Sequence, residues 1–335
     1  MCRAKLYILA RFFNQTNLTV ADSIFGAPKI SFQDVKDIDA SAPQLIIWAI
    51  PVMIFFTVVE YFVAKYQHRD DIYNDTELRG SVLVGLGNLL SNYLTKLVLF
   101  VVVVFFYNLV PWRMEFRWWL FIPCYVLLDL CSYWAHRISH EQRFWWTTHV
   151  PHHSGNNYNL AVSFRLSWIQ EFKILFFIPV TIAGFHPWIF FVVNQVAVLF
   201  QFWVHTEYIR KLPRWIEYIF ATPSNHRVHH GTQDKYIDKN YGATFIIWDR
   251  MFGTYQPEEE RPKYGLTTPV HTGNPFKLVF QEAIDLVNDV RKAKTWKERF
   301  WYTFGSPIAI AKYKRENTTV PDKQKATKFE FQKSS

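Results

Sequence analysis

Apolar stretches long enough to cross a bilayer alternate with polar connections along the first two thirds of this 335-residue chain. Residues 45–64 contain one acid, Glu60, and about 20 residues at 1.5 Å each cross a hydrocarbon core about 30 Å thick. Gly184 and Pro187 break the last apolar stretch, which predicts a hairpin of two short spans there. We expect the remaining spans near the ranges 81–110, 118–135, 172–183 and 187–204.

Histidines gather at the ends of these apolar stretches. His136 and His140 are spaced i, i+4, and two triplets share the spacing i, i+3, i+4, which places the rings of each set on one helix face. The triplets are His149, His152 and His153, and then His226, His229 and His230; His205 stands alone between them. Because a hairpin returns the chain to the side it left, we expect all of these histidines to converge on one face.

These patterns predict an all-α protein, an integral membrane helical bundle of about four to five spans in hairpins, with a cytosolic helical cap that carries a histidine-rich di-metal site. Residues 1–44 form an N-terminal interfacial segment, 45–275 the membrane domain, and 276–335 a C-terminal amphipathic segment with a polar tail. The cap comprises 136–171 and 205–275. Many Lys and Arg in the polar segments of this face favour the cytoplasmic side.

Composition agrees with a membrane-associated protein. Half of the residues are apolar and 19% are aromatic, and Trp and Tyr are favoured at membrane–water interfaces. The net charge of +9 suits a surface that faces anionic headgroups. The basic residues are scattered among acids, which argues against nucleic acid as a partner. Three cysteines are too few for a disulfide framework.

Nine clustered imidazoles are too many ligands for one metal ion and about right for two. All-nitrogen donors suit iron, zinc, copper or nickel, and the spacing alone does not choose among them. Two redox metals beside a lipid-facing pocket suit the activation of dioxygen against an unactivated C–H bond. His68, His186 and His271 have no companions, and we expect them to be structural or solvated.

Polar residues near the clusters are candidates for orienting the ligands. Asp129 lies seven residues before His136, two helical turns back, where it could accept a hydrogen bond from a free ring nitrogen. The alternative for this buried acid is a pair with Lys or Arg. The other candidates flank the clusters: Glu141, Asn156, Asn159, Glu171, Glu207 and Asn225.

Several blocks of the chain resemble the fatty acid hydroxylase and sterol desaturase superfamily of membrane di-iron oxygenases. The resemblance implies that two Fe ions are bound by all nine histidines, and that Glu141 is catalytic because the family has an acid directly after its first histidine pair. With it we group Asp129 and Asn159 as candidate catalytic residues. The blocks are Asp129 to His140, His149 to Arg165, Thr222 to Gly231, Asp238 to Gly242 and Trp248 to Tyr255.

Within the superfamily the chain most resembles the alkylglycerol monooxygenases, through His152-His153-Ser154, Tyr158-Asn159-Leu160 and the block from Phe202 to Glu207. This implies O2-dependent hydroxylation of the ether-adjacent carbon of an alkylglycerol in the lipid bilayer, which cleaves the ether lipid. It also implies an external reductant, tetrahydrobiopterin, or alternatively NAD(P)H through a separate haem or flavin electron-donor protein. The expected location is the endoplasmic reticulum membrane in a eukaryote or the inner membrane in a bacterium.

Two kinds of alternative remain open from the sequence. Sterol desaturases and sterol or fatty acyl hydroxylases of the same superfamily share the histidine pattern. A protein of another class, a histidine-rich metal transporter or a non-catalytic lipid-binding protein, would also carry imidazoles. Transport sites place histidines within spans on both faces, whereas these histidines lie beside spans.

Overall fold

The computed structural model of this chain describes residues 25–267, 270 and 272–318. The described residues form α-helices and 3₁₀-helices with no strand, as the all-α prediction requires. Residues 1–24 of the expected N-terminal interfacial segment, and residues 319–335 of the expected C-terminal segment with its polar tail, lie outside the described residues. The longer helices are α2 (Phe32–Ser41), α3 (Leu45–Tyr66), α4 (Asp75–Leu109), α5 (Phe121–Glu141), α9 (Pro187–Phe200), α13 (Pro275–Lys292), α14 (Trp296–Phe304) and α15 (Pro307–Thr318).

Three helices in the described part of the chain are long and apolar enough to cross a membrane. They are α3 with 22 residues, α4 with 35, and the 24-residue segment Trp118–Glu141, which joins a 3₁₀ turn to α5. Their outer surfaces carry large apolar side chains that no protein atoms cover, such as Phe55, Leu90 and Ile122, at 60%, 60% and 70% exposure. Such a surface is stable against lipid tails and costly against water.

The expected hairpin of two short spans at 172–204 consists of two short arms of different form. Its first arm is a 3₁₀-helix, η3 (Gln170–Phe177), followed by the five-residue α8 (Ile178–Ile182). Its second arm, α9, has 14 residues and extends about 21 Å, less than a hydrocarbon core about 30 Å thick. The chain reverses between them at Gly184, whose φ of 92° requires a residue without a Cβ.

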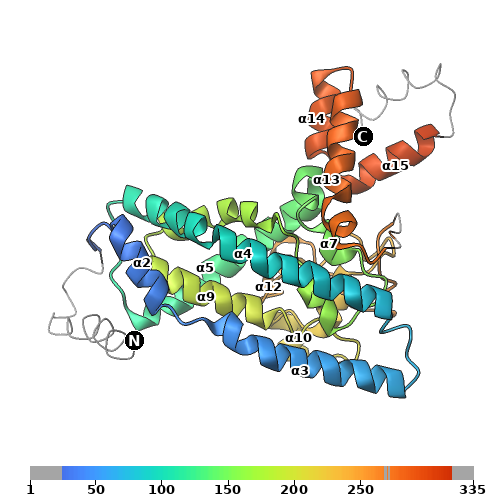
Figure 1. Cartoon of the computed structure of the whole chain (residues 1–335), viewed down its shortest axis with the longest axis horizontal. Coiled ribbons are helices and arrows are strands. Elements are labelled where there is room, and N and C mark those ends of the chain that lie inside the picture. Colours follow the sequence, from blue (N-terminus) through green and yellow to red (C-terminus); the bar gives the residue numbers. More distant parts are fainter. Residues whose placement is uncertain (1–24, 268–269, 271, 319–335) are drawn as a thin grey trace.

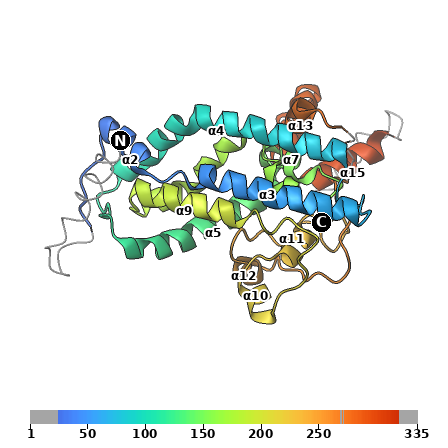
Figure 2. The same ribbon diagram turned by 60° about the horizontal axis from the view of Figure 1, so that its bottom comes forward.

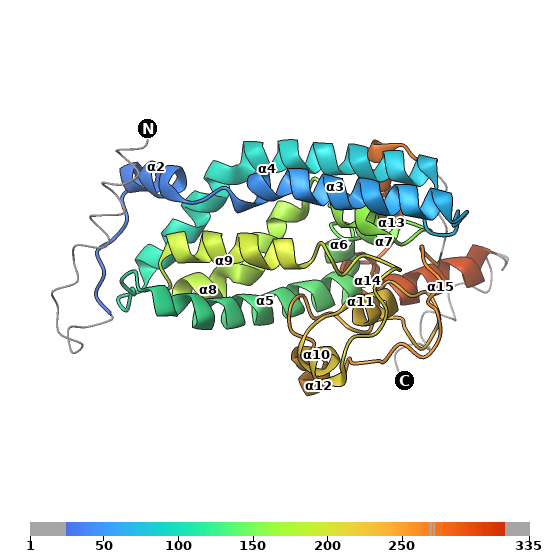
Figure 3. The ribbon, with the colours of Figure 1, turned by 90° about the horizontal axis from the view of Figure 1, so that it is seen from below.

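The bundle core lies between α4, α5, α8 and α9 (Figure 3). Val103 of α4, Leu128 of α5 and Ile189 of α9 are almost fully buried in it. The short helices α10 (Arg214–Ile219), α11 (Pro223–His229) and α12 (Ile247–Phe252) gather with their loops at one end of the bundle (Figure 2). The bundle therefore ends in a cap made of short helices and irregular segments.

Helix α4 begins at Asp75, six residues before the expected start of its span. The side chain of Asn74 accepts hydrogen bonds from the backbone N–H groups of Thr76 and Glu77 and so caps the helix. The polar residues just before the expected span therefore form a helical extension beyond the apolar stretch. Helix α5 similarly continues past its apolar part through His136 and His140.

A buried ion pair fastens the start of α4 to the cap. The Arg165 guanidinium, 1% exposed, donates to the Glu77 carboxylate at 2.6 Å and to the Ser154 hydroxyl at 3.0 Å. Asn156 donates to the other carboxylate oxygen of Glu77 at 2.7 Å. The segment that follows the first histidine triplet is thus held against α4.

Removing one member of this pair should be costly. We expect Glu77→Ala to lower the free energy of unfolding by about 3–5 kcal/mol, because the Arg165 charge is left buried without a partner. Chemical denaturation of the full chain in detergent micelles measures this. Lys235→Ala, which removes exposed pairs with Glu259 and Glu260, is the control and should have no measurable effect. Equal effects of the two variants would contradict the prediction.

Candidate metal centre

The nine predicted histidines lie together as two neighbouring groups, which confirms the expected convergence. Within each group, one ring nitrogen from every member lies within 4.8 Å of the others. His136 and His149 are partly exposed, and the other seven are buried. Cluster 1 consists of His136, His140, His149, His153 and His229, and cluster 2 of His152, His205, His226 and His230.

Each histidine triplet divides between the two clusters. His149 and His153 enter cluster 1 while His152 enters cluster 2, from the one-turn helix α7 (Val150–His153) and its N-cap. Helix α11 and its C-cap divide in the opposite sense, with His229 in cluster 1 and His226 in cluster 2. In each triplet, the rings at i and i+4 belong to one cluster and the ring at i+3 belongs to the other cluster. Because one short helix supplies ligands to both clusters, the two clusters are directly adjacent.

The Nε2 atoms of cluster 1 are in direct contact. The Nε2 of His149 lies 2.9 Å from that of His136 and 3.1 Å from that of His153. The Nε2 of His229 lies 3.1 Å from that of His153. Three contacts thus join four nitrogens in a row.

Protons alone do not satisfy these contacts. The Nδ1 of His136 lies 2.8 Å from the Tyr241 carbonyl oxygen, and the Nδ1 of His229 lies 2.9 Å from the Lys239 carbonyl oxygen. A carbonyl only accepts, so each Nδ1 carries the proton and each Nε2 presents a lone pair. The Nε2 atoms of His149 and His153 lie between these two lone pairs. Each would have to donate its proton to the lone pair beside it, so His149 and His153 would face each other across their contact without the lone pair and the proton that a hydrogen bond needs. At least one of the three contacts is therefore repulsive unless a cation lies among them.

The donor set fits a transition-metal cation. Nitrogen ligands about 2.1 Å from one ion lie about 3.0 Å apart at right angles and about 3.4 Å apart in a tetrahedron. The Nε2–Nε2 contacts in cluster 2 range from 2.9 to 3.2 Å and those in cluster 1 from 2.9 to 3.1 Å, close to the first value. The buried Nε2 of His140 has no hydrogen-bond partner and completes cluster 1 as a fifth donor.

Burial keeps these rings neutral, as a metal ligand must be. It lowers the pKa of His205 to about 4, and the pKa values of the rings at 149, 152, 153, 226, 229 and 230 lie well below the ordinary value for the same reason. Neighbouring imidazoles and the Lys173 ammonium add to this effect.

One loop orients three rings of cluster 1. Besides the Tyr241 and Lys239 carbonyls, it supplies the Asp238 carboxylate, which lies 3.7 Å from the Nδ1 of His140. Asp238 and Asn240 have φ values of 58° and 57°, a left-handed conformation that a short polar side chain tolerates. The resulting bends aim the carbonyls of Lys239 and Tyr241 at the rings of His229 and His136.

Asp129 does not contact a histidine, in contrast to the expectation from the sequence. Its carboxylate accepts hydrogen bonds from the backbone N–H groups of Thr244 and Phe245 at 2.9 and 3.1 Å and from the Trp248 indole at 2.9 Å. Asp129 lies two helical turns from His136 on the same face of α5, about 10.5 Å along the helix axis, and its side chain reaches the loop and not the ring. It acts on the cluster only through that loop.

Asp249 holds the same loop from the other side and was given no role by the sequence. Its carboxylate accepts from the N–H groups of Tyr241 and Gly242, both at 2.7 Å, and from the Thr254 hydroxyl at 2.6 Å. The carbonyl of Tyr241 is the partner of His136. The sequence signal for this role is weak. A carboxylate that binds backbone N–H groups needs no particular partner side chain, so no second residue type marks the contact in the sequence.

The two remaining candidate catalytic residues also lie away from the rings. Glu141 accepts from the Arg137 guanidinium at 2.8 Å, and its side chain is 44% exposed. Asn159 is buried; its amide oxygen accepts from the Ala161 N–H at 3.0 Å and its amide nitrogen donates to the Ile72 carbonyl at 2.5 Å. Asn159 therefore fastens the segment after the first histidine triplet to the residues that precede α4.

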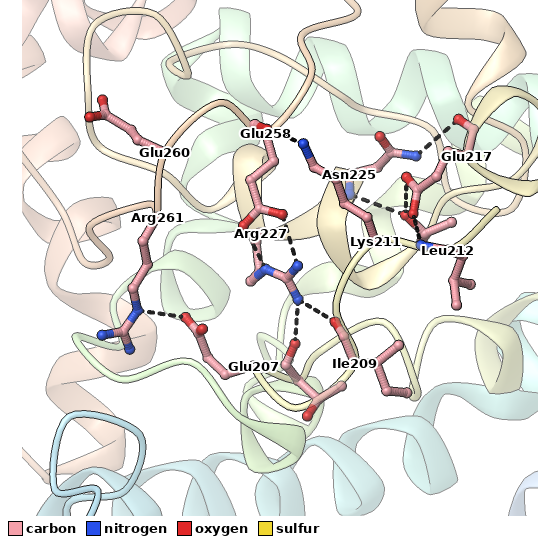
Figure 4. A network of polar contacts seen from close by, with 12 residues as sticks. Glu207, Ile209, Lys211, Leu212, Glu217, Asn225, Arg227, Glu258, Glu260 and Arg261 are labelled. Atoms are coloured by element: carbon pink, nitrogen blue, oxygen red, sulfur yellow. Dashed lines mark hydrogen bonds and ion pairs between the residues drawn. The ribbon is translucent and has the colours of Figure 1, made fainter. Parts of the chain in front are cut away.

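Arg227, next to His226, fixes α11 to the rest of the cap (Figure 4). Its guanidinium forms two hydrogen bonds of 2.8 Å with the Glu258 carboxylate and also donates to the backbone carbonyls of Thr206 and Ile209. Since Thr206 follows His205, this one side chain ties together two chain segments that supply cluster 2.

Other polar residues complete the site or lie apart from it. Lys173, which the sequence did not single out, places its ammonium 3.4 Å from the Nδ1 of His149. His186 caps α9 by accepting from the Trp188 N–H, and His68 is exposed, as expected of structural or solvated histidines. His271 lies outside the described residues.

The fatty acid hydroxylase family model matches residues 119–254, which include all nine clustered histidines. Alkylglycerol monooxygenase of Xenopus tropicalis is 44% identical over 179 residues, 53% of this chain and 39% of that protein. The Homo sapiens protein of that name is 38% identical over 183 residues, 52% of this chain and 39% of its own length. The one from Caenorhabditis elegans is 30% identical over 279 residues, 81% of this chain and 54% of its own length.

This chain thus spans about half or less of the length of these curated relatives. No solved structure shows a significant match to it.

Loosening the loop should weaken cluster 1 selectively. We expect Asp249→Asn to reduce bound metal from two ions per chain toward one, since an amide nitrogen would face a backbone N–H and release the Tyr241 carbonyl. Elemental analysis of metal-loaded protein measures the ratio, and loss of a group that orients a metal ligand costs about 10–100-fold in metal affinity. The exposed Asp234→Asn is the control. Two ions retained in the Asp249 variant would count against the orienting role.

Acid should destabilise the metal-free chain. His205 takes up its proton near pH 4 when folded but near pH 6.5 when unfolded, so the unfolded chain binds more protons between these values. Stability should therefore fall as the pH decreases from about 6.5 to 4, and the other depressed rings act in the same direction. Unfolding followed against pH tests this; bound metal should move the loss to lower pH. A profile that is flat over this interval would refute it.

Proposed function

We propose, since the chain contains a fatty acid hydroxylase family domain, that it is a membrane-bound di-iron monooxygenase that hydroxylates a lipid C–H bond. The observation that carries the proposal is the pair of adjacent imidazole clusters at the end of an apolar helical bundle. We propose all nine clustered histidines as iron ligands, five in cluster 1 and four in cluster 2.

Iron fits the donor set because neutral imidazole binds it well and no thiolate takes part. The two described cysteines, Cys124 and Cys131, lie in the bundle core and in neither cluster. When bound, the two iron ions would supply the activation of dioxygen: one oxygen atom would enter the substrate C–H bond, and the other would leave as water with two electrons from a reductant and two protons.

The protein's own residues prepare this chemistry in three ways. The Tyr241, Lys239 and Gln201 carbonyls fix the tautomers of His136, His229 and His205, so that their Nε2 lone pairs face inward. Burial excludes bulk water from the clusters and keeps the rings neutral. The carboxylates that hold the loop keep the rings in place without entering the site.

The substrate class that we propose is the alkylglycerols, because the relatives named above are alkylglycerol monooxygenases. Hydroxylation of the carbon beside the ether oxygen gives a hemiacetal, which breaks down to an aldehyde and glycerol. The clusters lie at the end of α5, whose apolar part forms the bundle, so a lipid would present its polar end to the metals while its tail stays among the helices.

Location and electron supply are further parts of the proposal. We place the cap on the cytosolic side of a multi-pass membrane protein, in the endoplasmic reticulum or a bacterial inner membrane, since basic loops favour that side. Tetrahydrobiopterin is the proposed reductant, with a separate electron-donor protein as the alternative. We also propose that the chain divides into an N-terminal segment, 1–44, a membrane domain, 45–275, and a C-terminal segment, 276–335.

Turnover of purified protein tests the function. The full chain, loaded with ferrous iron in detergent or nanodiscs, should release aldehyde from an alkylglycerol only when O2 and tetrahydrobiopterin are both present. Sterol and fatty acyl substrates, assayed in parallel, should remain unchanged. Oxidation of sterol or acyl chains alone would overturn the substrate class, and absence of iron-dependent oxygen consumption with every lipid would overturn the oxygenase.

Loss of a ligand should abolish turnover without unfolding the bundle. We expect His152→Ala to lower the rate by more than about 100-fold, since even residues behind the ligands contribute 10–100-fold. Bound iron should fall toward one ion per chain. His68→Asn, in an exposed left-handed position that Asn tolerates, is the matched control and should keep full activity. Comparable activity in the two variants would argue against cluster 2 as a metal site.

A further inference from the structure

The three C-terminal helices form an arm that leaves the bundle sideways. Helices α13 and α14 run transversely to α3 and α4, and α15 continues from their base (Figure 1). At the base of the arm, Leu278 and Val279 of α13 are buried against Val84 of α4. We call residues 275–318 the C-terminal arm.

The polar face of α13 is turned toward protein. Arg143 of α6 (Arg143–Trp146) donates to Glu282 and to Asp289, in both cases at 2.7 Å, and its side chain is 3% exposed. Lys314 of α15 reaches Asp289 at 2.8 Å. The charged face that a helix normally presents to water is thus occupied by neighbouring parts of the chain.

The opposite face of the arm is apolar and uncovered. Phe276, Ile284 and Val287 fall on one stripe of α13, roughly half a turn away from Glu282 and Asp289, and are 63%, 52% and 43% exposed. On α14 a second stripe at i, i+4 and i+8 is formed by Trp296, Phe300 and Phe304, at 82%, 68% and 42% exposure. A helix in water shows the reverse arrangement.

The arm joins the bundle at the level where the lipid-facing surface begins. Val84 of α4, which contacts the base of the arm, lies between Val82, Leu83 and Leu86, the first exposed apolar residues of that helix. The apolar stripes of the arm thus begin at the same level along α4 as the exposed apolar surface of the spans. Residues 275–318 also contain nine Lys or Arg against five Asp or Glu.

We propose that the C-terminal arm lies in the headgroup layer of an anionic bilayer, with the Phe276–Val287 and Trp296–Phe304 stripes inserted at the boundary with the acyl chains. Aromatic residues and an excess of cations are the features of interfacial helices. The arm would brace the cap against the membrane surface. This inference is independent of the reaction proposed above.

Depth-dependent fluorescence quenching tests the proposal on the full chain in nanodiscs that contain anionic lipid. Single cysteines carrying an environment-sensitive dye are placed by Val287→Cys and Phe300→Cys, with Lys292→Cys as the matched exposed control on the other side of α13. The background is Cys2→Ser; Cys124 and Cys131 are buried. Lipids nitroxide-labelled near the headgroup should quench the first two dyes several-fold more than the control.

Each other outcome overturns the inference. Equal, weak quenching at all three positions would place the arm in water. Dyes at Val287 and Phe300 that are shielded from water yet not quenched by labelled lipid, in nanodiscs found to hold two chains, would show that a second copy covers the stripes. Thermal unfolding of each labelled protein checks that the arm remains folded.

Discussion

Nine imidazoles in contact, with too few protons to satisfy one another, are the constraint around which this protein is arranged. The row of four Nε2 atoms in cluster 1 ends in two lone pairs that backbone carbonyls enforce, so a cation is the natural way to stabilise it. The bundle brings α5, α7 and α11 to one place, and the buried pairs of Arg165 and Arg227 keep the segments between them from separating.

Control of the rings is indirect and rests on the backbone. Asp129 and Asp249 bind N–H groups of residues 241–245 from two sides, and the carbonyls of that loop in turn orient His136 and His229. Carboxylates placed in this way stabilise the loop without competing for the metal or adding charge at the ligands.

The relation to the membrane follows from the same geometry. The clusters lie where the apolar part of α5 ends, so a lipid could meet the metals without leaving the bilayer. The C-terminal arm, whose polar face is used up on Arg143, leaves an apolar face for the headgroup layer. In the proposed arrangement, the metal centre meets the membrane boundary from within the bundle, and the C-terminal arm meets it from beside the bundle.

The sequence by itself determined the long apolar helices and the nine clustered histidines, because hydropathy and i, i+3, i+4 spacing are local properties that survive in any arrangement of the helices. It did not determine the number of spans: four to five were expected, and three helices in the described part of the chain are long and apolar enough to cross a membrane. It did not determine how His152 and His153 divide between two clusters, or that Asp129 holds Thr244 and Phe245 and not a histidine. The partners of Asp129 are backbone N–H groups more than 100 residues away in the chain, and almost every residue has such a group. Only the tertiary structure selects which of them a buried side chain meets.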